Sequence, residues 1–546
     1  MKTRKKGLLG LIAIAALAFA PMASPAYAVD VDITANVDIT VDDTATGNTY
    51  VAYQIFTGVP ADDTTTLTQV AWGAANPGAA TAGKVIAAYN AVADPDLDQA
   101  ASASSVADAI GKLSSENAVK FATQLGQALK DVPGIAMPAT GDPAKPTASV
   151  VPGYYIILQT AKDDAFTGYS SPLLKVAKDI TVTPKRGDVT SDKKVWENTD
   201  TPATPAVFTV QGDSWGDTAD YETGDNVPFR LHGTISTQLN AYTKYKFQFN
   251  DTLADGFTLN QDSIKVYIGD QEVTAGNFTT NVQGQSFTVG WENMLADTLT
   301  LPDTFAAGAD VYVTYTALLD GDAIIGNPGN ENKLTLTHSS NPADEGHEDT
   351  TPEDKVWVFT YEIDVTKVDS ADAATKIEGA KFKLWSAAEN GKCAVLNAGT
   401  YRIESWTETA DDCTELSSDA QGLFNVKGVD SGTYYLEETS VPEPYQLPTA
   451  RMQLVVTATT TVDDATQVGK IATLVLDSSA ANVAATPIDR IDPGIVAATI
   501  TNTSSTLLPE TGGIGTTIFT VVGLLVMAGA AGGLVIRNRR KEQASA

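Results

Sequence analysis

The hydrophobic pattern of the first third of the chain combines strands with helices. Between residues 29 and 183, strand-like segments enclose an alanine-rich stretch. In that stretch Phe121, Leu125, Leu129 and Val132 recur at the spacing of one helix face, and a Pro-Gly pair ends the pattern. We therefore expect a first domain, residues 29–185, in which α-helices are added to β-strands.

From about residue 190 the pattern becomes one strand after another. The segments VPFRL at 227–231 and LTL at 334–336 alternate with period two, and Gly, Asp, Asn and Pro mark frequent turns. A polar stretch over 341–352 interrupts this pattern and is expected to be a linker. We predict a mainly β chain of tandem Ig-like β-sandwich domains forming an elongated rod, with a second domain at 186–350 and a third at 351–507.

Both ends of the chain carry processing signals. Four basic residues, an apolar run and the small-residue site AYA at 26–28 predict a signal peptide over residues 1–28. Near the other end, residues 514–536 form an uncharged run of 23, which is long enough to cross a bilayer of roughly 30 Å. The basic residues that follow would remain in the cytoplasm.

A pentapeptide lies directly before this apolar run. It consists of Leu508, Pro509, Glu510, Thr511 and Gly512. Together with the span and the basic tail, it resembles the LPXTG sorting signal, so residues 508–546 are expected to be sorting signal, transmembrane segment and tail. In that family a sortase transpeptidase cuts between Thr and Gly and passes the Thr carbonyl to an amine. The resemblance implies a secreted protein that is anchored to the cell wall and is only transiently in the membrane as a precursor.

The exported part of the chain is strongly acidic. Without residues 1–28 and 512–546 it has 28 Lys and Arg against 66 Asp and Glu, a formal charge of −38. Such a surface repels nucleic acid, so nucleic-acid binding is excluded as a function. Scattered acidic residues are best explained as solvating groups, and we expect no enzyme activity on other molecules.

Cysteine and histidine are scarce. Cys393 and Cys413 are the only cysteines, and in an oxidising compartment they are expected to form one disulfide. Neither has a histidine neighbour, and the whole chain has three histidines. We therefore predict no metal site and no cofactor.

The last block opens with a lysine whose side chain is expected to be buried. In the strand over 361–369, alternation places Lys367 on the face of Ile363 and Val365. Burial lowers the pKa of a lysine, which makes its neutral amine a nucleophile, and it keeps a nearby carboxylic acid protonated. If an asparagine lies in the same pocket, attack on its carboxamide expels ammonia and leaves an isopeptide bond.

Later in this block the segment YYLEETSVPEPY at 434–445 resembles the E-box, YxLxETxAPxGY, of CnaB-type domains. It differs at Val441 and Pro444, both in the turn. The resemblance implies that Glu438 is the catalytic acid. It also implies that Asn502, on the final strand before the sorting signal, is the asparagine that joins Lys367.

The middle block has a similar order of residues and resembles a CnaA-type domain. Its lysine is Lys193 or Lys194, and Lys193 is preferred because it shares a face with Val195. Its asparagine is Asn332 or Asn330; Asn332 is preferred because it shares a face with Leu334 and Leu336. The acid is expected to be Asp225, which alternates with Val227 and Phe229, with Asp251 as the alternative. The first block has no lysine in its opening strand, so no bridge is predicted there.

A candidate acceptor amine lies between the first two blocks. The segment KDITVTPK at 178–185 resembles the Val-x-Pro-Lys pilin motif, with Lys185 as its lysine. The segment TYVAYQIF at 49–56 is similar to the opening of backbone pilins of the SpaA and Actinomyces fimbrial type. The resemblance spans the mature chain and implies a major shaft pilin.

In this family, sortase joins subunits head to tail. Here it would link Thr511 of one copy to Lys185 of the next. The expected partners are further copies of the chain, the sortase, a tip pilin, peptidoglycan at the base and a host or bacterial surface receptor. The alternative is a monomeric wall-anchored adhesin that does not use Lys185.

Overall fold

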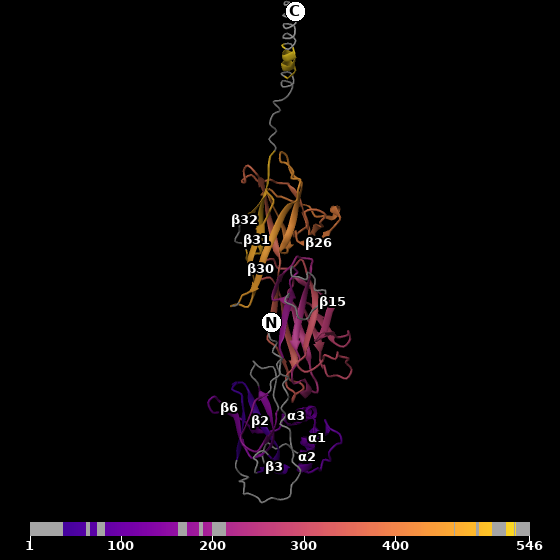
Figure 1. The fold of residues 1–546 in the computed structure, drawn as a ribbon, viewed down its shortest axis with the longest axis vertical. Coiled ribbons are helices and arrows are strands. Elements are labelled where there is room, and N and C mark those ends of the chain that lie inside the picture. Colours follow the sequence, from indigo (N-terminus) through magenta and orange to yellow (C-terminus); the bar gives the residue numbers. More distant parts are fainter. Residues whose placement is uncertain are drawn as a thin grey trace, which may run out of the picture.

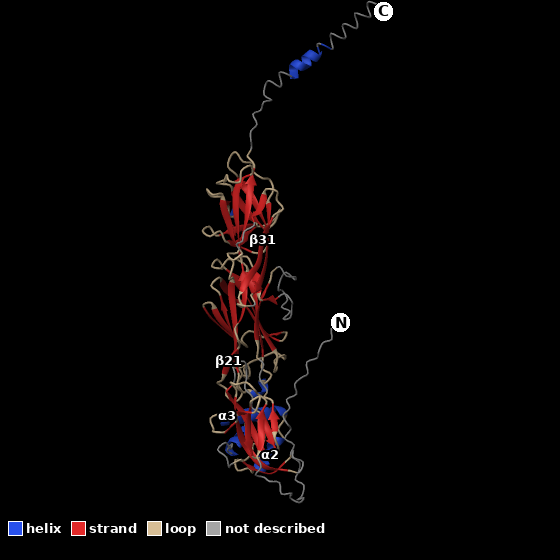
Figure 2. Cartoon of the chain, turned by 90° about the vertical axis from the view of Figure 1, so that its left-hand side faces the viewer, coloured by secondary structure: helices blue, strands red, loops and turns tan. Residues whose placement is uncertain are grey.

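The computed structural model describes residues 36–61, 66–73, 82–161, 172–184, 189–198, 215–463, 465–486, 491–504, 520–528 and 530. Three β-rich domains are stacked end to end into a rod, and the chain leaves the last domain at the end opposite the first (Figure 1). The view turned by 90° shows the same stacking, with α-helices in the first of the three domains and a further helical stretch, residues 520–528, beyond the last domain (Figure 2). The predicted elongated, mainly β fold is confirmed.

In its described residues, the first domain contains two sheets and three helices. One sheet has the order β5-β6-β1-β9, and the other has β3-β2-β7-β8 with β4 paired to β2. The elements are β1 (Val37–Val41), β2 (Thr49–Pro60), β3 (Leu67–Trp72), α1 (Ala82–Asn90), α2 (Ala103–Gly111), α3 (Ser115–Leu129), β4 (Ile135–Ala136), β5 (Ala139–Thr140), β6 (Lys145–Val150), β7 (Gly153–Ala161), β8 (Leu173–Val176) and β9 (Ile180–Val182).

The helical pattern read from the sequence corresponds to α3. Ser114 caps the helix by accepting a hydrogen bond from the Asn117 amide at 3.1 Å. Phe121, Leu125 and Leu129 are fully buried on the face that packs against the β2–β7 sheet. The other face of that sheet covers β1 and β6, so β7 is apolar and buried on both sides through most of its length.

The middle domain is a sandwich of two sheets with the orders β11-β10-β13-β19-β15-β16 and β12-β22-β20-β14-β18-β17, and β21 pairs with β20. Its core lies between them. The elements are β10 (Ser191–Trp196), β11 (Trp215–Gly216), β12 (Thr218–Asp220), β13 (Asn226–Thr234), η1 (Leu239–Ala241), β14 (Phe247–Leu253), β15 (Phe257–Ile268), β16 (Gln271–Glu272), β17 (Thr279–Gln283), β18 (Ser286–Trp291), β19 (Asp310–Leu319), β20 (Asn330–Ser339), β21 (Glu348–Thr350) and β22 (Asp354–Phe359).

The last domain also has two sheets, β28-β23-β33-β32 and β26-β25-β24-β29-β30-β31, with β27 paired to β24. Its first and last long strands, β23 and β33, are parallel neighbours. The elements are β23 (Tyr361–Asp369), β24 (Lys381–Trp385), β25 (Cys393–Leu396), β26 (Ile403–Thr407), η2 (Ala410–Asp412), β27 (Leu416–Ser417), β28 (Leu423–Val429), β29 (Gly432–Ser440), β30 (Met452–Val462), β31 (Gly469–Asp477), β32 (Val483–Thr486) and β33 (Ile495–Asn502).

The polar stretch after β20 is not a linker between the second and third domains. The strands on both sides of it, β20 and β22, pair with each other, so both belong to the middle sandwich. The junction lies instead at Thr360, a single buried residue between β22 and β23. A polar, Pro-containing loop within a domain has the same composition as a linker between domains. Only the pairing of the flanking strands shows which of the two it is.

This loop instead joins the middle domain to the first. Ala343 packs in the core of the first domain, against Gly126 of α3, where an added Cβ would lie 3.0 Å from the Ala343 Cβ. Around this contact, Gln127 donates to the Pro342 carbonyl at 3.1 Å and Lys130 pairs with Asp344 at 2.9 Å.

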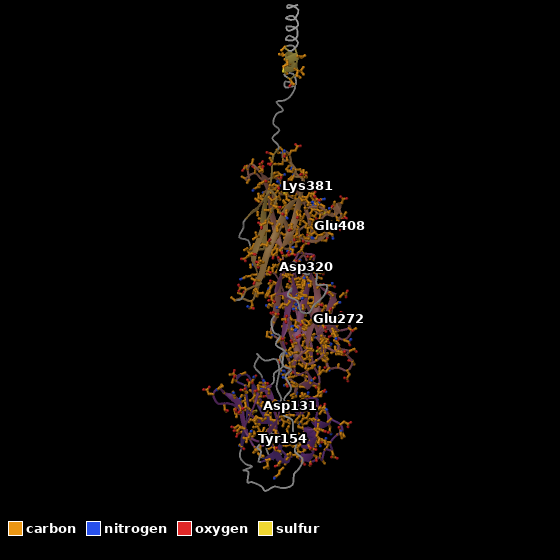
Figure 3. The ribbon with its side chains drawn as sticks, viewed as in Figure 1. Asp131, Tyr154, Glu272, Asp320, Lys381 and Glu408 are labelled. Carbon is orange, nitrogen blue, oxygen red and sulfur yellow. A yellow bond between two sulfur atoms is a disulfide. The ribbon has the colours of Figure 1, made fainter. Side chains whose placement is uncertain are left out.

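Acidic side chains are spread along the rod. Asp131, Glu272 and Glu408 are exposed and lie in the first, middle and last domains respectively (Figure 3). Each of the three domains therefore exposes acidic side chains.

Candidate functional site

Lys193 is buried in the middle domain, between the two sheets. It lies on β10, its side chain is 0% exposed, and its amine contacts the Asp251 carboxylate and lies 3.0 Å from the Tyr315 hydroxyl. The rings of Phe229 and Tyr315 lie 5.3 Å from the amine nitrogen. Its neighbour Lys194 points away and pairs with Asp217. Of the two candidate lysines, the structure therefore buries the preferred one.

The acid beside Lys193 is Asp251, and this corrects the preference for Asp225. Asp251 lies on the inward face of β14, between Phe249 and Leu253, and is 1% exposed. Asp225 precedes β13 in a turn at the joint to the last domain, where its backbone bonds to Glu222 and Leu319. Strand alternation does not govern a residue outside the strand, so it misplaced this carboxylate.

Both candidate asparagines are buried on β20, but their carboxamides differ. Asn330 donates to the carbonyls of Ile324 and Val358 at 3.0 and 3.1 Å and accepts from the Ile324 amide at 2.8 Å, so it holds the local backbone. Asn332 donates to the Tyr315 hydroxyl at 2.7 Å, and among the described residues its Oδ1 has no hydrogen-bond partner. Asn332 is thus the asparagine in the same buried site as Lys193 and Asp251, since all three contact the Tyr315 hydroxyl.

Tyr315 was missed in the sequence, although a signal for it exists. Val313, Tyr315 and Ala317 alternate on the inward face of β19, all at most 1% exposed. The Tyr315 hydroxyl donates to Asp251 Oδ1 at 3.0 Å and accepts from both Lys193 and Asn332. It therefore contacts all three groups of the site.

The last domain brings together the three residues expected there. Asn502 donates to both carboxylate oxygens of Glu438, at 3.1 and 3.0 Å, and the Lys367 amine lies 3.9 Å from Glu438 Oε1. All three side chains are at most 4% exposed. Within the described part of the chain, Lys367 Nζ and Asn502 Oδ1 have no hydrogen-bond partner.

In both sites, burial shifts the pKa values of the lysine and of the acid so that the neutral form of each side chain is favoured. In the last domain it lowers the pKa of the Lys367 amine to about 8 and raises the pKa of the Glu438 carboxyl. In the middle domain it lowers the pKa of Lys193 and raises the pKa of Asp251, while the attraction between the two opposes both shifts. A neutral amine beside a protonated acid and a carboxamide is the arrangement that amide transfer requires.

The ends that sortase would join are only partly described. Val182 ends β9, which runs parallel to β1, and Pro184 is half-buried. Lys185 and the sorting residues from Leu508 to Gly512 lie outside the described residues. So does most of the expected span at 514–536, of which residues 520–528 are helical; in the described ranges no helix is long and apolar enough to cross a membrane.

The expected disulfide is present. Cys393, at the start of β25, is joined to Cys413, which follows η2, with their Cα atoms 5.7 Å apart. The bond ties the β25–β26 hairpin to the segment that leads into β27.

Two protein families match parts of the chain. Residues 361–469 match the SpaA prealbumin-like fold domain, which begins here at the first residue of β23. Residues 500–543 match the LPXTG cell wall anchor motif. The first match covers most of the last domain, and the second confirms the sorting signal read from the sequence.

The chain is also similar to individual surface proteins. It is 23% identical over 369 residues to the trypsin-resistant surface T6 protein of Streptococcus pyogenes serotype M6, an alignment that covers 57% of this chain and 64% of that relative, less than two thirds of its length. The solved T6 backbone pilin of that serotype, a modular three-domain structure, matches with a TM-score of 0.51 and 15% identity over 86% of this chain and 98% of its own. The full-length major pilin SpaD from Corynebacterium diphtheriae matches with a TM-score of 0.44 and 14% identity over 87% of this chain and 99% of its own. The chain is therefore similar in sequence to the T6 protein, carries a SpaA-type domain and an LPXTG cell wall anchor, and shares the three-domain fold of the solved T6 backbone pilin.

Proposed function

We propose that this protein is the structural shaft subunit of a covalently polymerised cell-surface fimbria. Sortase joins Thr511 of one copy to Lys185 of the next, which gives a head-to-tail interface that does not close and hence a filament. The observation that carries the proposal is that both domains between Pro184 and Ser504 contain a buried lysine, acid and asparagine. These are the two domains through which tension between Lys185 and Thr511 would pass.

In each of these domains the lysine and asparagine form an isopeptide bond. The neutral amine of Lys193 or Lys367 attacks the carboxamide carbon of Asn332 or Asn502, a C–N bond forms, and ammonia leaves. Asp251 and Glu438 supply the acid. The first domain lies outside the load path, and its opening strand β1 has no lysine. Its lack of a bridge fits its position.

The remaining partners follow from the same assembly. A tip pilin occupies the free end of the filament, and the last subunit added is joined to peptidoglycan at the base. The shaft supports adhesion to a host or bacterial surface. It acts as a substrate of sortase and catalyses only its own internal bonds.

The shaft proposal is tested by replacing the acceptor amine. Lys185→Ala should abolish the ladder of SDS-resistant polymers on immunoblots of wall extracts and leave the monomer. Lys178→Ala, an exposed lysine of the same segment, is the matched control and should leave the ladder intact. A ladder that survives Lys185→Ala would refute the shaft proposal and favour a monomeric adhesin.

The bridges are tested independently by intact-protein mass spectrometry of the folded ectodomain. Each bridge removes the mass of one ammonia, so a loss of two is expected. Peptide mapping should recover Lys193 joined to Asn332 and Lys367 joined to Asn502. A folded ectodomain at its full calculated mass would overturn this part of the proposal.

A further inference from the structure

The two buried sites differ in how the acid reaches the asparagine. In the last domain, Glu438 accepts two hydrogen bonds directly from the Asn502 nitrogen. In the middle domain, Asn332 donates to the Tyr315 hydroxyl at 2.7 Å, and that hydroxyl donates to Asp251 at 3.0 Å. Aspartate is one methylene shorter than glutamate, and the tyrosine hydroxyl occupies the position between its carboxyl group and the carboxamide.

The position of this hydroxyl is fixed by packing. Tyr315 is 1% exposed, its ring stacks on Phe229 with 5.3 Å between centroids, and the edge of Phe287 meets it at 5.0 Å. It comes from β19, in the sheet that also carries Lys193, whereas Asp251 and Asn332 come from the facing sheet. The hydroxyl therefore lies at the point where the two sheets bring the reacting groups together.

We infer that Tyr315 is a proton relay between Asp251 and the departing nitrogen of Asn332, an inference that rests on the proposed Lys193–Asn332 bridge. When the Lys193 amine bonds to the Asn332 carboxamide carbon, Nδ2 becomes a tetrahedral amine nitrogen and can accept a proton. The two hydrogen bonds of the Tyr315 hydroxyl then reverse: the hydroxyl gives its proton to Nδ2 and takes the proton that Asp251 carries on Oδ1, the oxygen in contact with it. The carbon–Nδ2 bond breaks, and ammonia leaves.

The proton balance closes at Asp251. The lysine nitrogen loses one proton as it becomes an amide, and the Asp251 oxygen that contacts it accepts that proton. Asp251 thus ends protonated, as it began, and the Tyr315 hydroxyl again carries one hydrogen. No water or further reactant takes part, which suits a site whose side chains are fully buried.

The test is Tyr315→Phe, with the Lys193–Asn332 and Lys367–Asn502 peptides quantified over time after synthesis. The middle bridge should form about 10²-fold more slowly, the low end of what a positioned proton donor supplies. The last bridge in the same molecule is the internal control, because Glu438 contacts Asn502 directly. Tyr312→Phe, which removes a hydroxyl from the outer face of the same strand, should leave both bridges unchanged.

A rescue variant separates the relay from packing. In Tyr315→Phe combined with Asp251→Glu, the longer acid can reach Asn332 as Glu438 reaches Asn502, so bridging should return. An unchanged rate in Tyr315→Phe, or a double variant as slow as the single one, would overturn the relay while leaving the bridge itself intact. Absence of the bridge in the unmodified protein would instead overturn the proposed function.

A further measurement applies if Tyr315→Phe does not fold. Replacing all tyrosines with a fluorinated tyrosine keeps the ring and the hydroxyl but lowers the pKa of the hydroxyl. The rate of the middle bridge should change and that of the last bridge should not. Equal effects on both bridges would rule out the relay.

Discussion

Asn502 donates its carboxamide nitrogen to both carboxylate oxygens of Glu438, at 3.1 and 3.0 Å, although 64 positions separate them in the chain. β29 supplies the acid and β33 the amide, and the two strands belong to different sheets of the last domain. Lys367, on the strand next to β33, completes the group. The proposed bridge would therefore join the first and last long strands of the domain.

Replacing Glu438 should prevent this bridge. Glu438→Ala removes the proton donor, so the last domain should not lose ammonia, and the intact mass should show one bridge fewer than in the unmodified protein. Loss of a closed loop of this length should also lower the free energy of unfolding by about 5 kcal/mol, by the chain-entropy estimate used for disulfides. The control is Glu437→Ala, on the opposite face of β29 and paired with Arg451. A domain that still loses ammonia in Glu438→Ala would refute the role of this acid.

The two buried asparagines of the middle domain should respond differently to substitution. Asn332→Ala should abolish the middle bridge, as seen in the intact mass. Asn330→Ala should keep the bridge but lower the free energy of unfolding by about 1–3 kcal/mol, because backbone groups of Ile324 and Val358 lose their partner. The reverse pattern, with the bridge lost only in Asn330→Ala, would show that the reactive asparagine is misassigned.

An unbridged last domain should become more stable as the pH rises from 8 to 10.5. Burial lowers the pKa of Lys367 from 10.5 to about 8, so between these values the unfolded chain binds the extra proton. In Asn502→Ala, which cannot form the bridge, urea unfolding should therefore show a rising free energy of unfolding across this window. The rise should disappear when Lys367→Met is added. A difference between the two variants that does not depend on pH would contradict the lowered pKa.

Contact between α3 and the Ala343 loop should fix the angle between the first two domains. Gly126→Leu places a side chain where only 3.0 Å separates an added Cβ from Ala343. Small-angle X-ray scattering should then show a broader range of particle lengths. Gly83→Leu is the control, since an added Cβ on α1 meets only the Gln99 side chain, at 3.8 Å. Identical scattering from the two variants would mean that this contact does not hold the joint.

Periodicity and local motifs determined much of this protein in advance. Alternation placed Lys367 inward because every second residue of a strand faces the core, and the four-residue spacing of Phe121, Leu125 and Leu129 predicted α3. The sorting signal and the disulfide between the two cysteines could be predicted from the sequence because each depends on a few residues close together in the chain. The same local patterns predicted three domains, the first with helices, but they placed the boundary between the second and third at residues 350–351 instead of at Thr360.

Tertiary structure decided what depends on contacts between distant strands. It chose Asp251 over Asp225, because a turn residue does not follow the alternation of the strand beside it. It assigned the polar loop after β20 to the joint with the first domain, because the flanking strands pair with each other. It also brought Tyr315 from β19 to Asn332 on β20, in the facing sheet. Spacing along one strand shows which way a side chain points, but only the packing of the sheets determines which side chain it meets.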